Sequence, residues 1–173
     1  TLFRSKAVEN DLKSLSMLEM VIAPLSRQYQ SKETLEEIKK VFLNELDYGL
    51  EAENADLFRR ITHDLPDVLI PKVYHALSTR RVLTEDRIGG VNYDEFCQSA
   101  DQQARNHAGT TIWTFMFRSL LRHGVMYADP HPGNYRFLPD GRVGFLDFGC
   151  VKRLPAEMVD GMKRYMRAVM DSD

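Results

Sequence analysis

Apolar residues recur at helical spacing through the first third of the chain. A helix is predicted over residues 5–29, where five apolar side chains follow one another at intervals of three or four: Val8, Leu12, Leu15, Leu18 and Ile22. Pro24 is expected to kink or end this helix, because proline has no backbone N–H. A second, longer helix is predicted from Ser31 to Ile61, with Ser31 as its N-cap.

The pattern then changes to prolines and β-branched residues, which favour extended structure. The segments "VYHAL" (residues 73–77) and "RRVLTEDRI" (residues 80–88) flank a turn predicted at Ser78–Thr79. Together they predict a β-hairpin, which ends at Gly89-Gly90.

Two helices are predicted next, a short one over Tyr93–Gln98 and a long one over Asp101–His123. Gly124 is suited to end the long helix, because glycine adopts the left-handed conformation of a helix C-terminus. Its inward face is predicted to consist of Ala108, Ile112, Phe115, Ser119 and Leu120. Trp113 and the aromatic residues around it are interpreted as core.

The last third begins with "NYRFLPDGRVGFLDFG", residues 134–149, which predicts two short strands joined by a turn at Pro139–Gly141. A final helix is predicted to begin near Pro155. The order is helices, hairpin, helices, hairpin and helix. It predicts an α+β fold that is mostly helical.

Composition narrows the class of protein. At 173 residues, with 43% hydrophobic and 28% charged residues, the chain suits one globular domain. Its 23 basic and 25 acidic residues nearly balance, and no nucleic-acid-binding motif is present, so no nucleic-acid partner is expected. Cys97 and Cys150 form neither a CxxC pair nor a disulfide framework, which favours a reducing compartment.

No run of about 18 apolar residues marks a membrane span, and the start "TLFRSKAVEND" lacks the apolar region of a signal peptide. An intracellular location is therefore expected. The chain is interpreted as a piece of a longer protein, because it lacks an initial Met and its end, "RYMRAVMDSD", stops inside an amphipathic pattern.

The candidate chemistry centres on "MYADPHPGNYRF", residues 126–137. Phosphoryl transfer needs a carboxylate beside the attacking hydroxyl or water, and oxygen ligands that hold Mg²⁺ on the phosphates. Asp129, Asn134 five residues later, and Asp147 after the hairpin supply these groups. The loop is expected to present Asp129 and Asn134 together, and the hairpin to return Asp147 beside Asn134. His131 is interpreted as a turn residue that bonds backbone carbonyls rather than as a metal ligand.

The motif D-x-x-x-x-N followed by D-F-G resembles the protein-kinase superfamily. More specifically, "LLRHGVMYADPHPGN" and "FLDFGCV" are similar to the UbiB/AarF family of atypical kinases. "NELDYGLEAEN" matches that family's E-x-D signature, and "STRRVLTEDRIGG" resembles its passage into the hinge. The resemblance covers roughly residues 8–170 in the family's order.

The resemblance implies a role for each matching residue. Asp129 takes the place of the catalytic-loop acid, and Asn134 and Asp147 take the places of two metal ligands. Glu51 matches the helix-C glutamate that pairs with a strand lysine. The E-x-D pair comprises Glu45 and Asp47. The hinge that contacts adenine would comprise Glu85, Asp86, Arg87 and Ile88.

A partial protein-kinase-like domain over residues 1–173 is therefore expected, with helix C, the end of the N-lobe and the hinge in residues 1–88 and the C-lobe in residues 89–173. The family's phosphate loop, V-A-x-K strand and K-x-G-Q motif are absent from the sequence. Because clamping of the phosphates is a large share of catalysis, the chain alone is expected to be inactive or a poor enzyme.

Helix geometry bears on whether Glu45, Asp47 and Glu51 can contact the same partner. On a straight helix at about 100° per residue, Glu45 and Glu51 point roughly 120° apart, while Asp47 and Glu51 share a face at i, i+4. The acids are therefore expected to serve different partners, or the helix bends at Gly49.

The resemblance implies Mg²⁺-dependent ATP binding, with ATP hydrolysis or small-molecule phosphotransfer in support of ubiquinone or other isoprenoid lipid metabolism. A lipid or isoprenoid substrate and association with a membrane surface are implied with it. Two alternatives stay open. One is a small-molecule phosphotransferase of the aminoglycoside/choline type, and the other is a non-catalytic regulator that senses nucleotide.

Overall fold

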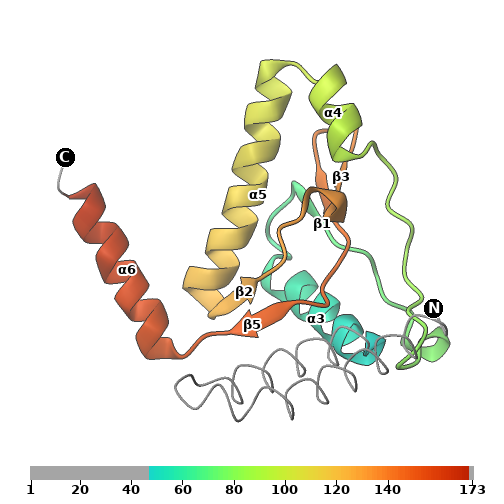
Figure 1. Ribbon diagram of the computed structural model, residues 1–173, viewed down its shortest axis with the longest axis horizontal. Helices are drawn as coiled ribbons and strands as arrows, with labels where there is room; N and C mark the ends of the chain where they lie inside the picture. The colour runs from blue at the N-terminus through green and yellow to red at the C-terminus, as the bar shows by residue number, and fades with distance from the viewer. Residues whose placement is uncertain (1–46, 172–173) are drawn as a thin grey trace, which may run out of the picture.

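The computed structural model describes residues 47–171 (Figure 1). The predicted helix over residues 5–29, the first part of the predicted helix from Ser31, and Glu45 lie outside the described residues. The helices are α3 (Tyr48–Ile61), α4 (Tyr93–Ser99), α5 (Gln102–His123) and α6 (Ala156–Met170), with two 3₁₀ turns, η1 (His75–Leu77) and η2 (Pro132–Asn134). The strands are β1 (Val68–Leu69), β2 (Val125–Tyr127), β3 (Tyr135–Phe137), β4 (Val143–Phe145) and β5 (Val151–Arg153).

Two small sheets hold the centre of the molecule. One has the order β1-β4-β3, and in the other β2 pairs antiparallel with β5. The predicted hairpin is confirmed: β3 and β4 pair antiparallel, with Tyr135 opposite Phe145 and Phe137 opposite Val143. Gly141, in the turn between them, has a φ of +89°, a value that glycine adopts without strain. The α+β fold class is confirmed.

The predicted unbroken helix through residue 47 is wrong. Asp47 has extended backbone angles and is the N-cap of α3, and its Oδ1 accepts a hydrogen bond of 3.0 Å from Gly49 N. Aspartate favours this position because its side chain satisfies an otherwise unpaired N–H of the first turn. Asp47 therefore does not share a helix face with Glu51, and the interruption falls two residues before the bend considered at Gly49.

The predicted hairpin over residues 73–88 is only partly confirmed. The chain does reverse, but only isolated bridges form, between Val73 and Glu85 and between Thr79 and Val82. The tight turn therefore lies between Thr79 and Val82, not at Ser78–Thr79. Local side-chain bonds compete with a regular ladder here, since the Ser78 hydroxyl bonds the carbonyl of Tyr74 at 2.9 Å and the amide of Thr84 donates to Ser78 Oγ at 3.0 Å.

The helices α4 and α5 are confirmed. Asp101 caps the start of α5, and Gly124 ends it with a φ of +65°. The interpretation of Trp113 as core is wrong, because its side chain is 62% exposed and stacks on Phe117. Trp113 precedes the fully buried Phe115 by two residues, which is about 200° around a helix, so the two side chains point to opposite faces.

Five aromatic side chains form the centre of the core, and each is at most 1% exposed: Phe58, Phe115, Tyr127, Phe145 and Phe148. The rings of Phe58 and Phe115 lie 5.2 Å apart, those of Phe115 and Phe145 3.9 Å, and those of Tyr127 and Phe148 5.7 Å. This aromatic cluster joins α3, α5, β2 and β4 to the segment that follows Asp147.

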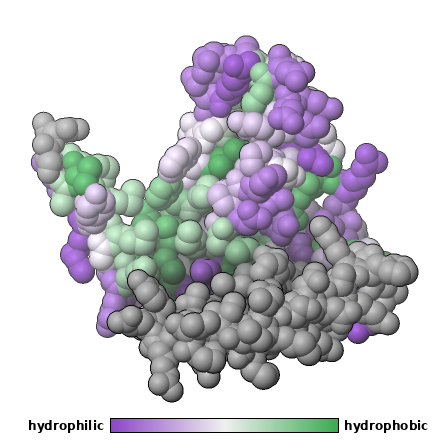
Figure 2. All heavy atoms as spheres, in the orientation of Figure 1, coloured by the Kyte–Doolittle hydropathy of each residue, from purple (hydrophilic) through white to green (hydrophobic). Residues whose placement is uncertain are grey.

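The helix α6 extends away from the rest of the described chain (Figure 1). Val159 is its one buried residue within residues 156–170, whereas Met158, Tyr165 and Met170 are exposed. Figure 2 shows apolar surface gathered where α6 meets the body of the molecule. No helix within residues 47–171 is long and apolar enough to cross a membrane.

The pair Gly89 and Gly90 offers a test of this fold. Gly90 has a φ of +94°, and a Cβ there would lie 2.5 Å from Phe137 O. Gly90→Ala is therefore expected to lower the free energy of unfolding by about 2 to 4 kcal/mol, measured by urea denaturation. Gly89→Ala is the control, because nothing lies within 4 Å of a Cβ at Gly89. Equal effects of the two variants would contradict the bridge between Val91 and Phe137.

Candidate active site

The candidate site begins where β2 ends. After Tyr127, the N–H of Ala128 donates to Cys150 O at 3.0 Å, which extends the pairing of β2 with β5 by one bond. The chain then leaves the sheet at the exposed Asp129 and turns through η2. His131 accepts a hydrogen bond of 3.0 Å from Gly133 N through its Nδ1. Its role in the turn is confirmed, but the bonded group is an N–H and not a carbonyl.

The structure brings Asn134 and Asp129 together. Asn134 Nδ2 lies 3.3 Å from Asp129 Oδ2 and 3.3 Å from Asp129 O. Asn134 immediately precedes β3, and its carbonyl accepts a hydrogen bond of 3.0 Å from Leu146 N. Because Asp147 follows Leu146, the hairpin returns Asp147 to the same end of the sheet as Asn134.

Asp147 lies in a tight turn that faces α3. Its Oδ1 accepts a hydrogen bond of 2.8 Å from Gly149 N, which fixes the carboxylate. Asn54 on α3 donates from Nδ2 to Phe148 O at 2.9 Å, so the helix is attached to this turn. The arrangement keeps Glu51, one turn earlier on α3, close to Asp147.

Asp147 changes the pKa values of two neighbouring acids, Glu51 and Glu85. Burial and then the charge of Asp147 raise the pKa of Glu51 to about 7, and the backbone of Phe148 partly offsets the rise. Burial, Asp147 and Asp86 likewise raise the pKa of Glu85. Within residues 47–171, Glu51 has no ion pair with a basic side chain. Glu51 and Glu85 therefore both interact with Asp147, and none of these three acids has an ion pair within residues 47–171.

The predicted hinge lies against β4. A Cβ placed at Gly144 would lie 2.8 Å from Ile88 Cγ2, so Ile88 packs directly over that glycine. Asp86 is fixed by two bonds, from its N–H to Lys72 O at 2.9 Å and from the Tyr74 hydroxyl to its Oδ1 at 2.7 Å. The backbone of Arg87 makes no backbone hydrogen bond with any described residue.

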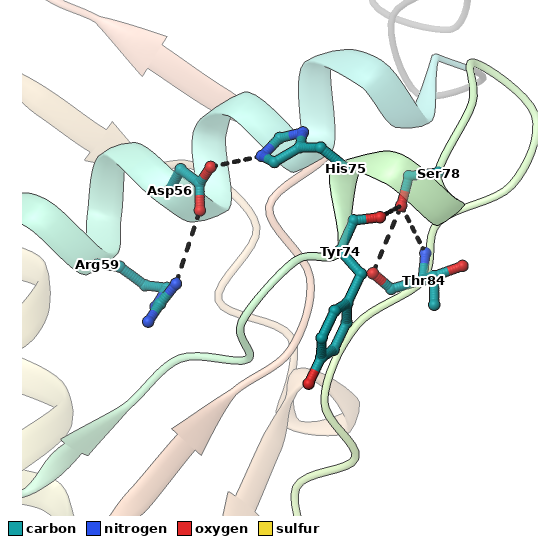
Figure 3. Close-up of polar contacts among 6 residues, drawn as sticks. All are labelled: Asp56, Arg59, Tyr74, His75, Ser78 and Thr84. Carbon is teal, nitrogen blue, oxygen red and sulfur yellow. Dashed lines mark hydrogen bonds and ion pairs between the residues drawn. The ribbon is translucent and has the colours of Figure 1, made fainter.

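Two polar contacts connect residues 75–80, which precede the predicted hinge, to α3 and its N-cap. Asp47 Oδ2 lies 2.9 Å from both Nε and Nη2 of Arg80. Further along α3, Asp56 Oδ2 contacts His75 Nε2 at 2.6 Å, and Figure 3 shows His75 pointing from η1 toward the helix. Sequence reasoning missed both contacts, because they join residues 19 and 33 positions apart.

The oxygen ligands fit a magnesium ion that is shared with phosphates. No cluster of three His, Cys, Asp or Glu side chains that could hold a metal by itself occurs within the described part of the chain. The candidate metal ligands from this chain are therefore the amide oxygen of Asn134 and the carboxylate of Asp147. Mg²⁺ typically binds one or two protein carboxylates and takes its other ligands from substrate phosphates and water.

Comparison with known proteins defines the class. A family model described as the ABC1 atypical kinase-like domain matches residues 5–173, and the chain belongs to this family. A solved structure, described as the complex of Rv3197 with erythromycin from Mycobacterium tuberculosis, has the same fold with a TM-score of 0.76 and 34% sequence identity. The match covers 86% of this chain and 38% of that one.

The similar curated proteins include two from Arabidopsis thaliana and one from Rattus norvegicus. The chloroplastic protein ACTIVITY OF BC1 COMPLEX KINASE 1 is 38% identical over 68% of this chain, and ACTIVITY OF BC1 COMPLEX KINASE 3 is 37% identical over 65%. The mitochondrial atypical kinase COQ8B of the rat is 26% identical over 98% of this chain. The matches span 17%, 16% and 32% of these relatives' own lengths.

The raised pKa of Glu51 predicts that the free energy of unfolding depends on pH. Because the pKa of Glu51 rises from 4.5 to about 7 in the folded chain, the folded state keeps a proton that the unfolded state has lost. The free energy of unfolding should therefore fall as pH rises through this window, by roughly 1 to 2 kcal/mol once partial exposure is allowed for. Urea denaturation between pH 4.5 and 8 measures this change.

Glu51→Gln should flatten the profile in that window, because the amide does not titrate. Glu53→Gln is the matched control on the exposed side of the same helix and should leave the profile unchanged. An identical pH dependence in wild type and Glu51→Gln would show that Glu51 titrates normally.

Proposed function

We propose that this chain supplies the metal-binding and catalytic side of a nucleotide site, in an atypical kinase or ATPase that binds ATP with Mg²⁺. The proposal is supported by the contact of Asn134 with Asp129 and by the hydrogen bond from Leu146 N to Asn134 O, which brings the neighbouring Asp147 to the same end of the β3–β4 hairpin. These are the groups that phosphoryl transfer requires, and the family is one of atypical kinases.

Each residue has a separate task in this proposal. Asp129 is exposed at the mouth of the loop, where its carboxylate accepts the proton of an attacking hydroxyl or water. The amide oxygen of Asn134 and the carboxylate of Asp147 hold the ion, which when bound neutralises the charge on the phosphates. Asp147 is suited to a fixed position, because Gly149 N already binds one of its oxygens.

The Glu51 carboxylate is proposed to pair with a lysine that does not belong to residues 47–171. Its raised pKa supports this role, because a buried carboxylate near another negative charge is stabilised when a cation binds it. The Arg87 backbone, which makes no backbone hydrogen bond with a described residue, is suited to contact the adenine edge, together with its neighbours Glu85, Asp86 and Ile88. The contacts of Asp47 with Arg80 and of Asp56 with His75 attach the segment before the hinge to α3.

The acceptor is proposed to be water or a small molecule, in support of ubiquinone or other isoprenoid lipid metabolism. The names of two relatives, a chloroplastic ACTIVITY OF BC1 COMPLEX KINASE and a mitochondrial atypical kinase, support an organellar setting. The exposed apolar residues of α6 stand beside basic ones, Lys163, Arg164 and Arg167, which supports contact with a lipid substrate or a membrane surface.

Substitution of the two acids tests the proposal in the full-length protein. Asp129→Asn should lower kcat by about 10² to 10⁴ and leave nucleotide binding intact, because it removes the base and not a metal ligand. Asp147→Asn should weaken Mg²⁺-dependent nucleotide binding as well. ATP turnover and binding of a fluorescent ATP analogue measure the two effects.

Asp140→Asn is the matched control, because Asp140 is an exposed acid in the turn of the same hairpin and pairs with Arg142. It should leave both readouts unchanged. A full-length wild type that binds ATP but turns over nothing, with a cellular function insensitive to Asp129→Asn, would favour the nucleotide-sensing regulator instead.

A further inference from the structure

Tyr127 has a buried hydroxyl that nothing above explains. The residue is 1% exposed, and its Oη has no hydrogen-bond partner among the described residues. Buried tyrosine hydroxyls normally find a partner, because losing water without a replacement bond is costly. An unpaired hydroxyl at this depth therefore indicates a group that becomes paired in the working site.

The ring of Tyr127 cannot turn the hydroxyl away. Four aromatic rings surround it, those of Phe58, Phe115, Phe145 and Phe148, at centroid distances between 5.6 and 6.2 Å. The backbone is fixed as well, because Tyr127 pairs with Val151 across the β2–β5 sheet. The direction of the hydroxyl is therefore set by the core and not by the solvent.

Tyr127 lies beside the candidate site, because β2 ends at Tyr127 and leads through Ala128 directly to Asp129. Burial and then the charges of Tyr135, Asp147 and Asp129 raise the pKa of Tyr127, and an interaction of hydrogen-bond type with the side chain of Asn134 partly offsets this rise. The Asn134 amide is thus a neighbour of the hydroxyl, but the two do not meet the geometry of a formed hydrogen bond. Tyr127 is thus close to the loop acid and to both proposed metal ligands. It stays a neutral hydroxyl that can both donate and accept a hydrogen bond.

We propose that Tyr127 is a positioning residue, whose hydroxyl fixes which end of the Asn134 amide faces the divalent cation. The Asn134 Nδ2 carries two hydrogens, and its contacts with Asp129 are both 3.3 Å, which is long for a hydrogen bond. The Tyr127 hydroxyl accepts the second hydrogen when the Asn134 amide turns toward it. With the nitrogen held on both sides, the amide oxygen is left for the ion.

This inference rests on the proposed function, and it identifies the contact that makes the amide oxygen of Asn134, and not its nitrogen, the metal ligand. An asparagine that is free to flip presents its NH₂ group as often as its oxygen, and an NH₂ group does not bind a cation. Partners that orient a metal ligand change metal affinity by about 10- to 100-fold when they are removed. The ligand class is a divalent cation bound to nucleotide phosphates.

Tyr127→Phe in the full-length protein provides the test, with Mn²⁺ and ADP as the probe. Mn²⁺ affinity, measured by electron paramagnetic resonance, should weaken about 10-fold, and the Mg²⁺ concentration for half-maximal turnover should rise by a similar factor. The value of kcat at saturating Mg²⁺ should change less than about two-fold. The melting temperature should stay unchanged or rise, because the variant removes an unpaired buried hydroxyl.

Phe115→Leu is the matched packing control. It disturbs the same ring cluster, since Phe115 lies 5.6 Å from Tyr127, but it keeps the hydroxyl. It should lower the melting temperature, and it should weaken Mn²⁺ affinity less than Tyr127→Phe does, because the hydroxyl is still present. Equal losses of Mn²⁺ affinity in the two variants would overturn the inference, because the effect would then come from packing.

The outcomes also separate this inference from the proposed function. Wild-type Mn²⁺ affinity in Tyr127→Phe, together with loss of affinity in Asp147→Asn, would overturn the role of Tyr127 and leave the nucleotide site standing. Absence of Mn²⁺–ADP binding in wild type would overturn both.

Discussion

The pairing of β3 with β4 is the constraint on which the rest of the site depends. The hairpin has no freedom of register, because a slip of one residue would move Tyr135 and Phe145 from the core to the other face of the sheet. The same register places Leu146 opposite Asn134 and hence Asp147 next to it. Burial of aromatic rings therefore determines the separation of two polar side chains that are 13 residues apart in sequence.

Local signals in the sequence were sufficient for the helices of the C-terminal half and for the β3–β4 hairpin. Gly124 and the turn at Pro139–Gly141 restrict the backbone directly, so they mark element ends without knowledge of the fold. The pairing of Val68 with Val143 has no such signal, because it joins residues 75 positions apart. Trp113 was misassigned for a related reason, since residue type was weighed above its position around the helix.

The candidate site was predictable where its residues are close in sequence. Asp129 and Asn134 are neighbours through one short loop, so their spacing alone indicated that they meet. The Asp47 cap and its contact with Arg80 were not predictable, because continuous helical periodicity hid the break and the partner comes from another segment. Tyr127 was missed because an apolar strand context suggests packing, and only its unpaired hydroxyl indicates more.

The aromatic cluster and the acids act as one unit. Phe58 and Glu51 lie on the same helix, and Phe148 directly follows Asp147, so the contact between the two rings, with centroids 5.2 Å apart, holds α3 against the turn that carries Asp147. Negative charges on Glu51 and Asp147 repel each other, because solvent screens charges only weakly in a partly buried site. The ring contacts hold the two segments together, so a cation bound between the two carboxyl groups would relieve their repulsion. The hydrophobic core thus holds the acids of α3 and of the Asp147 turn near one another, which supports the proposal that a cation binds there.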